Sequence, residues 1–292
     1  MLMQDANQLQ PRATLALLQH YQAGMPQLAL YGLSENWLLK ECAHLHWMAI
    51  ARAQGRDEPA FADIDGHRSY AALTAVRLRE AQFDAVTEHA PFALLARLVP
   101  HGRAQHYSAQ TVRMGNTRVA RIELLSALVR RAPGGGNRSV ARAQMQPDGD
   151  GLTSGNATLM AAAAELKSLG RAHRTAAHAG EVLRSFDFTP CPNSDFNGAG
   201  FLYFATFQAL VDRAEFAWYG LRPAVTVERT LYFHGNIDPG EAVRVELLEA
   251  GAEPDGFHHR CRVVRRADRG HQHRLGLCEG RCLARSVGTG GQ

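Results

Sequence analysis

Two segments combine a polar residue that can cap a helix with small residues that let a ligand approach the backbone. Ser34 directly precedes one helical stretch, and Asn197 precedes Gly198, Ala199 and Gly200 in another. The first amides of a helix lack partners within the helix and favour negative charge. We therefore predict that Asn197 acts in catalysis at an oxyanion and that the other four residues bind substrate. The alternative is that Asn197-Gly198 forms only a turn and a cap.

His46, on the first helical stretch, is a further catalytic candidate, with a satisfied core or surface histidine as the alternative. His44 and His46 are two residues apart and do not share a helix face, which disfavours a two-histidine metal site. Cys278 and Cys282 have no second ligand pair at zinc spacing. No GxGxxG, P-loop or GxSxG pattern follows a clear strand. We therefore predict no metal and no bound cofactor.

Composition excludes several classes of protein. The chain has 292 residues, of which 46% are hydrophobic, and this length predicts two domains or one large one. No apolar run approaches the ~18 residues of a membrane-spanning helix, and the N-terminus lacks the pattern of a secretory signal. The five cysteines are scattered, as in a reducing cytoplasm. The net charge is +4, and the basic residues are spread along the chain with acidic residues between them. No nucleic-acid or membrane partner is therefore predicted.

The two ends of the chain repeat one order of elements: a short strand, a helix and four strands. In the first half the helix is predicted over 34–54, and the later strands over 69–79, 92–99, 105–113 and 119–130. In the second half the helix is predicted over 198–218, and the later strands over 224–233, 242–248, 258–266 and 274–284. We predict structural units at 1–131 and 181–292, joined by a Gly/Pro/Ala-rich linker at 132–180. Residues 158–169 of the linker have helical composition.

The second helix indicates how each unit folds. Residues 199–210 are apolar on almost every side, so this helix must be buried all round and a sheet must wrap it. The first helix is more one-sided, with Leu38, Cys42, Leu45 and Ala49 at near-helical spacing. We therefore predict an α+β fold of the double hot-dog type, with two central helices each wrapped by a curved antiparallel sheet.

Two long motifs resemble a known family. Residues 32–41 read GLSENWLLKE and run on to His46-Trp47, and residues 190–205 read PCPNSDFNGAGFLYFA. Together they resemble the leinamycin-type bifunctional acyltransferase/decarboxylases of polyketide biosynthesis, in the double hot-dog superfamily. The resemblance implies that methylmalonyl-CoA is decarboxylated and that its propionyl group is delivered to an acyl carrier protein. By its position after the first helix, Tyr70 matches the family's proposed catalytic tyrosine.

Such a reaction makes clear chemical demands. Decarboxylation of a 2-carboxyacyl thioester gives an enolate, which needs hydrogen-bond donors, a dry pocket and a proton source. The aromatic stretch 196–207 can exclude water. A tyrosine hydroxyl can donate to the enolate or protonate it. As a nucleophile, Tyr70 would need an activating neighbour such as His46 or His67, because the reference pKa of tyrosine is about 10.

Other functions stay open on the same fold. A thioesterase would rely on an acid near a central helix, for which Glu35, Glu41 and Asp212 are candidates. A dehydratase would need a histidine and an acid that face each other. A non-catalytic module that binds acyl groups or a carrier protein is the third alternative. A double hot-dog chain already pairs two units, so either a monomer or a homodimer is consistent with it.

Overall fold

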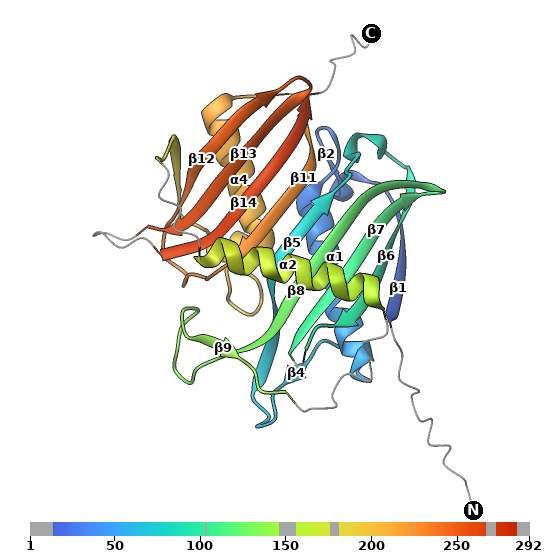
Figure 1. The fold of residues 1–292 in the computed structure, drawn as a ribbon, viewed down its shortest axis with the longest axis vertical. Helices are drawn as coiled ribbons and strands as arrows, with labels where there is room; N and C mark the ends of the chain where they lie inside the picture. The colour runs from blue at the N-terminus through green and yellow to red at the C-terminus, as the bar shows by residue number, and fades with distance from the viewer. Residues whose placement is uncertain are drawn as a thin grey trace, which may run out of the picture.

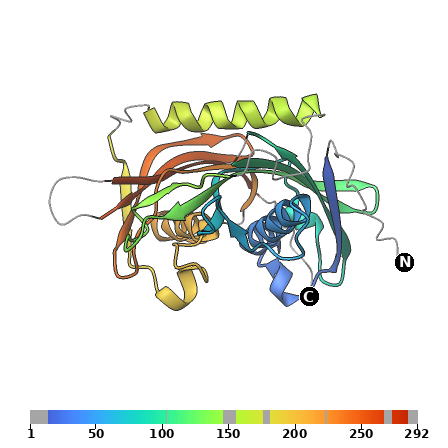
Figure 2. The same cartoon turned by 90° about the horizontal axis from the view of Figure 1, so that it is seen from below.

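Two long helices lie side by side in the hollow of one continuous antiparallel sheet (Figures 1 and 2). A computed structural model describes residues 14–102, 104–145, 156–175, 181–222, 224–266 and 273–284. Residues 146–155 and 176–180 of the predicted linker lie outside these residues. Within them, twelve strands form the sheet in the order β1-β6-β7-β8-β5-β11-β14-β13-β12-β10, with β4 beside β5 and β9 beside β8.

The elements of the first half precede α2 in the chain. Its helix is α1 (Glu35–Ala53), and its main-sheet strands are β1 (Leu15–Gln22), β4 (Phe61–Ala62), β5 (Arg68–Arg79), β6 (Pro91–Pro100), β7 (Gln105–Met114), β8 (Thr117–Arg131) and β9 (Val140–Arg142). A short hairpin, β2 (Leu28–Ala29) and β3 (Gly32–Leu33), precedes α1. Two 3₁₀ turns, η1 (Met25–Gln27) and η2 (Phe83–Ala85), complete this half.

The second half follows α2 (Ala157–Thr175). It consists of β10 (Arg184–Phe188), α3 (Pro192–Asp195), α4 (Phe204–Tyr219), β11 (Ala224–Phe233), β12 (Val243–Glu253), β13 (Gly256–Arg265) and β14 (His273–Ala284). Both halves therefore place one long helix against a curved antiparallel sheet. The bounds predicted for the two units and the linker stay a prediction.

The start of α1 confirms the cap predicted at Ser34. The Ser34 Oγ accepts a hydrogen bond from the Trp37 amide at 3.3 Å. From there Leu38, Cys42 and Ala49 are fully buried on the face of the helix that meets the sheet. The spacing of these residues thus holds α1 in the core of the first half.

The second helix begins later than predicted, at Phe204 rather than Gly198. Gly200 has φ +75°, a left-handed conformation that ends any regular helix on its N-terminal side. The Asn197 Oδ1 accepts hydrogen bonds from the amides of Ala199 and Phe201, each at 3.1 Å, and so offers the backbone an alternative to the helix. Residues 197–203 therefore form an irregular segment in front of α4.

Helix α2 lies across the opposite, convex face of the sheet (Figure 2). Its Ala163 and Leu166 are fully buried, and they pack in one cluster with Tyr107 of β7 and Tyr232 of β11. This helix covers strands of both halves and extends beyond the predicted 158–169 at both ends. No helix among the described residues combines the length and apolar character needed to span a membrane.

Strands β5 and β11 join the two halves over a short distance. They pair only from Ala75 with Tyr232 to Leu78 with Arg229. Beyond Tyr232 the two strands separate, so the next residues of β11 and the preceding residues of β5 border an opening in the sheet. The cavity described below lies in this fork.

A buried ion cluster links α1 to the second half. Arg229 of β11, which is 3% exposed, has its Nε at 2.9 Å from Glu35 Oε1 and its Nη2 at 2.7 Å from Asp212 Oδ1 on α4. Burial raises the pKa of Glu35 to about 7, and the guanidinium of Arg229 opposes this shift. One arginine therefore compensates carboxylates from both central helices.

We expect Arg229→Leu to lower the free energy of unfolding by about 3 kcal/mol or more, because it leaves the Glu35 carboxylate buried without its cation. Chemical denaturation at pH 8.5, where Glu35 is ionised in the wild type, measures this loss. Arg229→Lys, which keeps a charge but lacks the planar fork, should lose less. A loss below about 1 kcal/mol for Arg229→Leu would contradict a role of this cluster in joining the halves.

Candidate active site

A cavity of about 1210 Å³ occupies the fork between β5 and β11. Its walls come from residues 68–74, from the irregular segment 197–203 with the flanking Phe196 and Phe204, and from residues 233–236. Phe204, Phe207 and Phe233 form a buried aromatic wall. The rim is exposed and basic, and includes Arg68, Arg142 and Arg174. The cavity therefore combines a dry interior with a positively charged entrance.

Tyr70 of β5 lines this cavity and is half-buried. Its ring meets Phe201 edge-on, with the ring centres 5.6 Å apart. The guanidinium carbons of Arg68 and Arg131 lie 5.5 and 5.9 Å from the centre of the tyrosine ring. No described residue hydrogen-bonds to the Tyr70 hydroxyl. The ring is thus held between an aromatic side chain and two cations, while its hydroxyl stays available to a ligand.

Asparagine side chains hold the irregular segment in front of α4. Asn197 binds the amides of Ala199 and Phe201, as described above. Asn236 clamps Leu202 from the other side, since its Oδ1 accepts from the Leu202 amide at 2.8 Å and its Nδ2 donates to the Leu202 carbonyl at 3.1 Å. The backbone between these two clamps therefore has a fixed shape at the cavity wall.

Asn137 and Arg131 support the same segment from the first half. The buried Asn137 Nδ2 donates to the carbonyls of Gly200 at 2.7 Å and Ile237 at 2.6 Å. Arg131 donates to the carbonyl of Ala199 and, at 2.7 Å, to Asn137 Oδ1, with its guanidinium 4.1 Å from the centre of the Phe201 ring. Neither residue was a sequence candidate. The Gly-rich composition around Asn137 indicates a turn, but it does not indicate which residues that turn contacts.

The structure brings four of the predicted site residues together. Tyr70, Asn197, Gly198 and Ala199 all line the cavity. Ser34 and Gly200 are not among its described lining residues, and Gly200 instead shapes the backbone turn. The amides of residues 198–200 do not begin a helix, which corrects the prediction. The actual start of α4, at Tyr203 and Phe204, lines the cavity, and no side chain caps it.

His46 lies in the core of the first half rather than in the cavity lining. Its Nδ1 is 2.8 Å from Ser108 Oγ and its Nε2 is 2.8 Å from Ser126 Oγ. Burial lowers the pKa of His46 to about 3, so the ring is neutral at physiological pH. Both nitrogens are engaged by serines, and this placement gives no support to the hypothesis that His46 activates Tyr70.

The described lining contains no aspartate or glutamate, whereas six arginines line the cavity. The acids considered for a thioesterase lie elsewhere. Glu35 and Asp212 pair with Arg229, and Glu41 accepts a hydrogen bond from the Tyr21 hydroxyl at 2.6 Å. His234, which the sequence did not single out, is the histidine of the described lining and directly follows β11.

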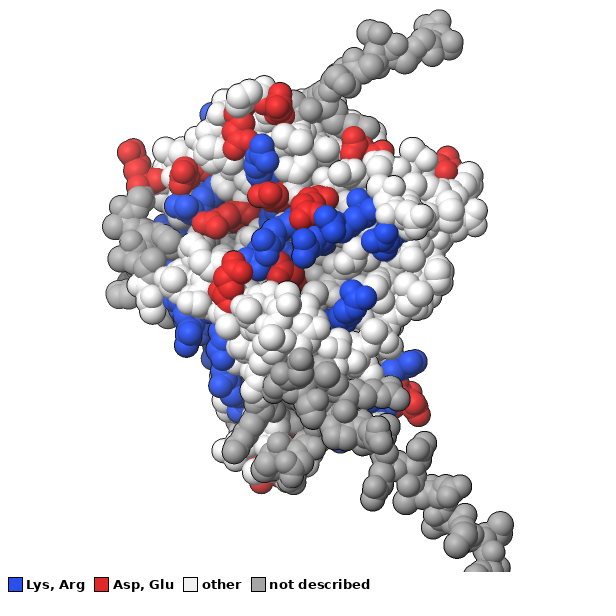
Figure 3. Space-filling view, turned by 45° about the vertical axis from the view of Figure 1, so that its right-hand side comes forward, with Lys and Arg blue, Asp and Glu red and all other residues white. Residues whose placement is uncertain are grey.

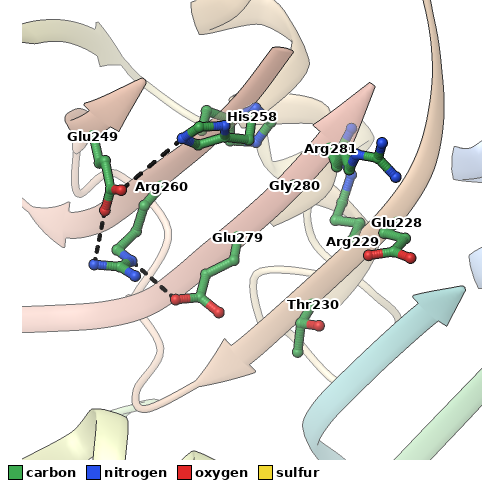
Figure 4. A pocket seen from close by; sticks show the side chains of 10 residues that line it. Glu228, Arg229, Thr230, Glu249, His258, Arg260, Glu279, Gly280 and Arg281 are labelled. Atoms are coloured by element: carbon green, nitrogen blue, oxygen red, sulfur yellow. Dashed lines mark hydrogen bonds and ion pairs between the residues drawn. The ribbon is translucent and has the colours of Figure 1, made fainter. Parts of the chain in front are cut away.

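Two other groups of polar residues have local structural roles. One group of potential metal ligands, all within 4.8 Å of one another, consists of Asp63, Asp65 and His67. Asp63 Oδ1 accepts hydrogen bonds from the amides of Asp65 and His67, and these bonds fix a turn. A shallow hollow of about 270 Å³ on the outer face of the sheet holds Arg260 between Glu249 and Glu279, at 3.0 and 2.9 Å (Figure 4). These contacts are cross-strand ion pairs, which stabilise neighbouring strands.

Comparison with known proteins shows the fold. No family profile matches the sequence, and a search of curated proteins finds no match. Among solved structures, the 12:0-ACP thioesterase from Umbellularia californica superposes with a TM-score of 0.70 at 10% identity, over 92% of this chain and 98% of that one. An acyl-ACP thioesterase from Bacteroides thetaiotaomicron gives 0.58 at 8% identity, over 91% and 97%. The predicted double hot-dog fold is confirmed.

Two neighbouring glycines should respond differently to valine. A Cβ at Gly198 would meet no atom within 4 Å, so Gly198→Val should leave the melting temperature unchanged and place its side chain in the cavity. Gly200 has φ +75°, so Gly200→Val should cost about 1–2 kcal/mol of stability. We expect turnover to fall roughly tenfold or more in folded Gly198→Val, as substrate is displaced. Normal turnover would remove this turn from the active site.

The lowered pKa of His46 predicts how the stability of the protein depends on pH. Its pKa is lower in the folded state than in the unfolded chain, so its contribution is present above about pH 6.5 and is lost as the pH falls. The free energy of unfolding of the wild type minus that of His46→Gln should therefore drop by about 2 kcal/mol between pH 7 and pH 5. The subtraction cancels other groups such as Glu35. A constant difference would show that the pKa of His46 is the same in the folded and the unfolded chain.

Proposed function

We propose that this protein is an acyltransferase/decarboxylase that acts on a 2-carboxyacyl-CoA, methylmalonyl-CoA being the expected substrate, and loads the resulting acyl group onto an acyl carrier protein. One observation carries the proposal: Tyr70 and six arginines line a cavity whose described lining has no carboxylate. Arg138 and Arg265 pair with Glu241 outside this lining. No described carboxylate pairs with Arg68, Arg142 or Arg174, so the cavity favours an anionic substrate. The resemblance of residues 32–47 and 190–205 to the leinamycin-type enzymes supports the same reaction.

The first step is loss of CO₂ from the bound thioester. The bond between C2 and the carboxylate breaks, and its electron pair forms an enolate on the thioester oxygen. Desolvation of the carboxylate against the aromatic wall of Phe204, Phe207 and Phe233 favours this loss. The enolate oxygen accepts from the Tyr70 hydroxyl and from backbone amides at the start of α4. The Tyr70 hydroxyl then delivers its proton to C2, which gives the propionyl thioester, and Tyr70 regains a proton from solvent.

The second step transfers the propionyl group. The thiol of the carrier's phosphopantetheine attacks the thioester carbonyl, and the tetrahedral oxyanion uses the same donors as the enolate. The C–S bond to CoA breaks, and the proton of the attacking thiol ends on the departing CoA thiolate. In this direct route Tyr70 is a hydrogen-bond donor. In the alternative route its hydroxyl carries the acyl group between the two thiols.

Hydrolysis is the second candidate, because the solved neighbours are named as thioesterases. The distribution of acids argues against it. A hot-dog hydrolase of the type considered above needs a carboxylate near the scissile thioester, and Glu35, Glu41 and Asp212 are absent from the described cavity lining. A dehydratase would need such an acid opposite His234. The remaining alternative is a module that binds the acyl group without turnover.

Intact-protein mass spectrometry separates these functions. The protein is incubated with methylmalonyl-CoA and a holo carrier protein, and a panel of malonyl and longer 2-carboxyacyl-CoAs defines the substrate range. A carrier that gains a propionyl group supports the proposal. Release of free acid with an unloaded carrier indicates a thioesterase, and no turnover of any member indicates a binding module.

We expect Tyr70→Phe to reduce carrier loading by ~10²-fold or more, because it removes the donor to the enolate and leaves the ring packed on Phe201. The melting temperature should barely change. If Tyr70 only packed against Phe201, carrier loading by Tyr70→Phe would stay near that of the wild type, because the ring is kept and no described residue hydrogen-bonds to the hydroxyl. Phe201→Leu is a matched control for the packing of the ring, since it loosens that contact and keeps the hydroxyl.

The two roles of the Tyr70 hydroxyl also predict different adducts. As a donor, it leaves no covalent mark when wild-type protein meets acyl-CoA without carrier protein. As a nucleophile, it gives an acylated Tyr70 peptide in digests of the same mixture. We expect no adduct, because both ring nitrogens of His46 are engaged by serine hydroxyls and no described residue hydrogen-bonds to the Tyr70 hydroxyl to remove its proton. Detection of the acylated peptide would overturn the donor role.

A further inference from the structure

A group of four cations extends from the rim of the cavity onto helix α2. Arg142 of β9 and Arg174 of α2 both line the cavity. Lys167, Arg171 and Arg174 are spaced four and three residues apart and share one face of α2. Arg142 and Arg174 line the same cavity, so β9 and α2 meet at its rim. Burial lowers the pKa of Lys167, and the charges of Arg171 and Arg142 lower it further.

These four cations, called the rim cluster below, lack acidic partners. Within the described part of the chain, no carboxylate pairs with Arg142, Lys167, Arg171 or Arg174. The face shown in Figure 3 carries acidic and basic side chains next to one another. Within the sheet, Arg77 Nε lies 2.7 Å from Glu123 Oε2. Cations held close together without counter-charges repel one another, and a bound anion would relieve that repulsion.

A purely structural explanation covers only part of the cluster. Cations in the last turn of a helix interact favourably with its dipole, and this accounts for Arg174 and in part for Arg171. It does not account for Arg142, which comes from a different element, or for Lys167, which lies two turns before the end of α2. The convergence of β9 and α2 on one rim therefore needs a further reason.

The packing of α2 fixes the rim cluster relative to the cavity. Leu166 is buried on the sheet, and Gly170 lets the ring of Tyr232 approach so closely that a Cβ there would lie 3.2 Å from it. At the C-terminal end of the helix, the carbonyl of His173 accepts a hydrogen bond at 2.6 Å from Arg274, which itself lines the cavity. The cations are thus presented on a rigid support.

We propose that the rim cluster binds the phosphate end of a phosphopantetheine thioester whose acyl end enters the cavity at Tyr70. The inference rests on the proposed function, because it assigns the two ends of one substrate to one site. Arginine matches phosphate oxygens in a bidentate geometry, and Lys167 adds a point charge. Two sources carry this phosphate: CoA, with its diphosphate and 3′-phosphate, and the carrier protein, with a single phosphodiester.

Binding measurements test the proposal without requiring turnover. Isothermal calorimetry compares CoA, 4′-phosphopantetheine and pantetheine on wild-type protein and on Arg171→Gln/Arg174→Gln. We expect the double variant to bind CoA at least about tenfold more weakly, with unchanged affinity for pantetheine. Arg97→Gln, at an exposed arginine of β6, is the control for the loss of a surface charge. Equal affinities of wild type and double variant for CoA and phosphopantetheine would overturn the proposal.

The pattern of losses identifies the source of the phosphate. If CoA and phosphopantetheine both weaken, the rim cluster holds the phosphate next to pantetheine, which CoA and carrier share. If only CoA weakens, it holds the nucleotide phosphates of CoA. Lys167→Gln, on the same face of α2, repeats the test if the double variant does not fold. Because binding is read directly, a protein that binds CoA at this rim and fails to decarboxylate methylmalonyl-CoA would refute the proposed function and leave the rim site standing.

Discussion

The short pairing between β5 and β11 is the constraint on which the site depends. Four residue pairs, from Ala75 with Tyr232 to Leu78 with Arg229, are enough to make the two sheets continuous. A longer ladder would close the fork and fill the place of the cavity with backbone. The buried helices and α2 compensate for the short ladder, because the core on the concave side and the Leu166 cluster on the convex side both span the junction. The two strands can therefore diverge at the fork while the two halves stay packed together.

The two helix starts show how far the halves have diverged. The start of α1 faces the second half through Glu35, which Arg229 neutralises in a closed, buried contact. The start of α4, at Phe204, lies instead on the open cavity with Tyr70 of the first half. A chain with two equivalent units could in principle hold two equivalent sites. Here an ion cluster fills one of the positions and an aromatic, arginine-rimmed cavity forms at the other.

The sequence was sufficient for the fold and for part of the site. Burial of the second helix on all sides predicts a wrapping sheet, and the Ser34 cap places α1 correctly. The predicted start of α4 was wrong, because composition does not show that Gly200 has a positive φ or that the Asn197 side chain accepts hydrogen bonds from the amides that follow it. Asn137 and Arg131 support the site through contacts with residues that lie more than 60 positions away in the chain. Local patterns carry no information about such contacts.

Charge decides between the chemistries that this fold can support. Hydrolysis needs a base that activates water, a role that a carboxylate of the protein would fill in the cavity. Decarboxylation needs no carboxylate from the protein, because the substrate supplies its own, but it needs hydrogen-bond donors for the enolate. Arginines at the rim favour an anionic ligand such as the proposed 2-carboxyacyl thioester, whereas the interior offers Tyr70, asparagines and aromatic rings. A bound carboxylate that moves inward from this rim loses hydration and cationic partners together. In the proposed reaction its negative charge becomes costly there, and departure as neutral CO₂ would relieve that cost while the electron pair moves to the thioester oxygen, to which Tyr70 is proposed to donate.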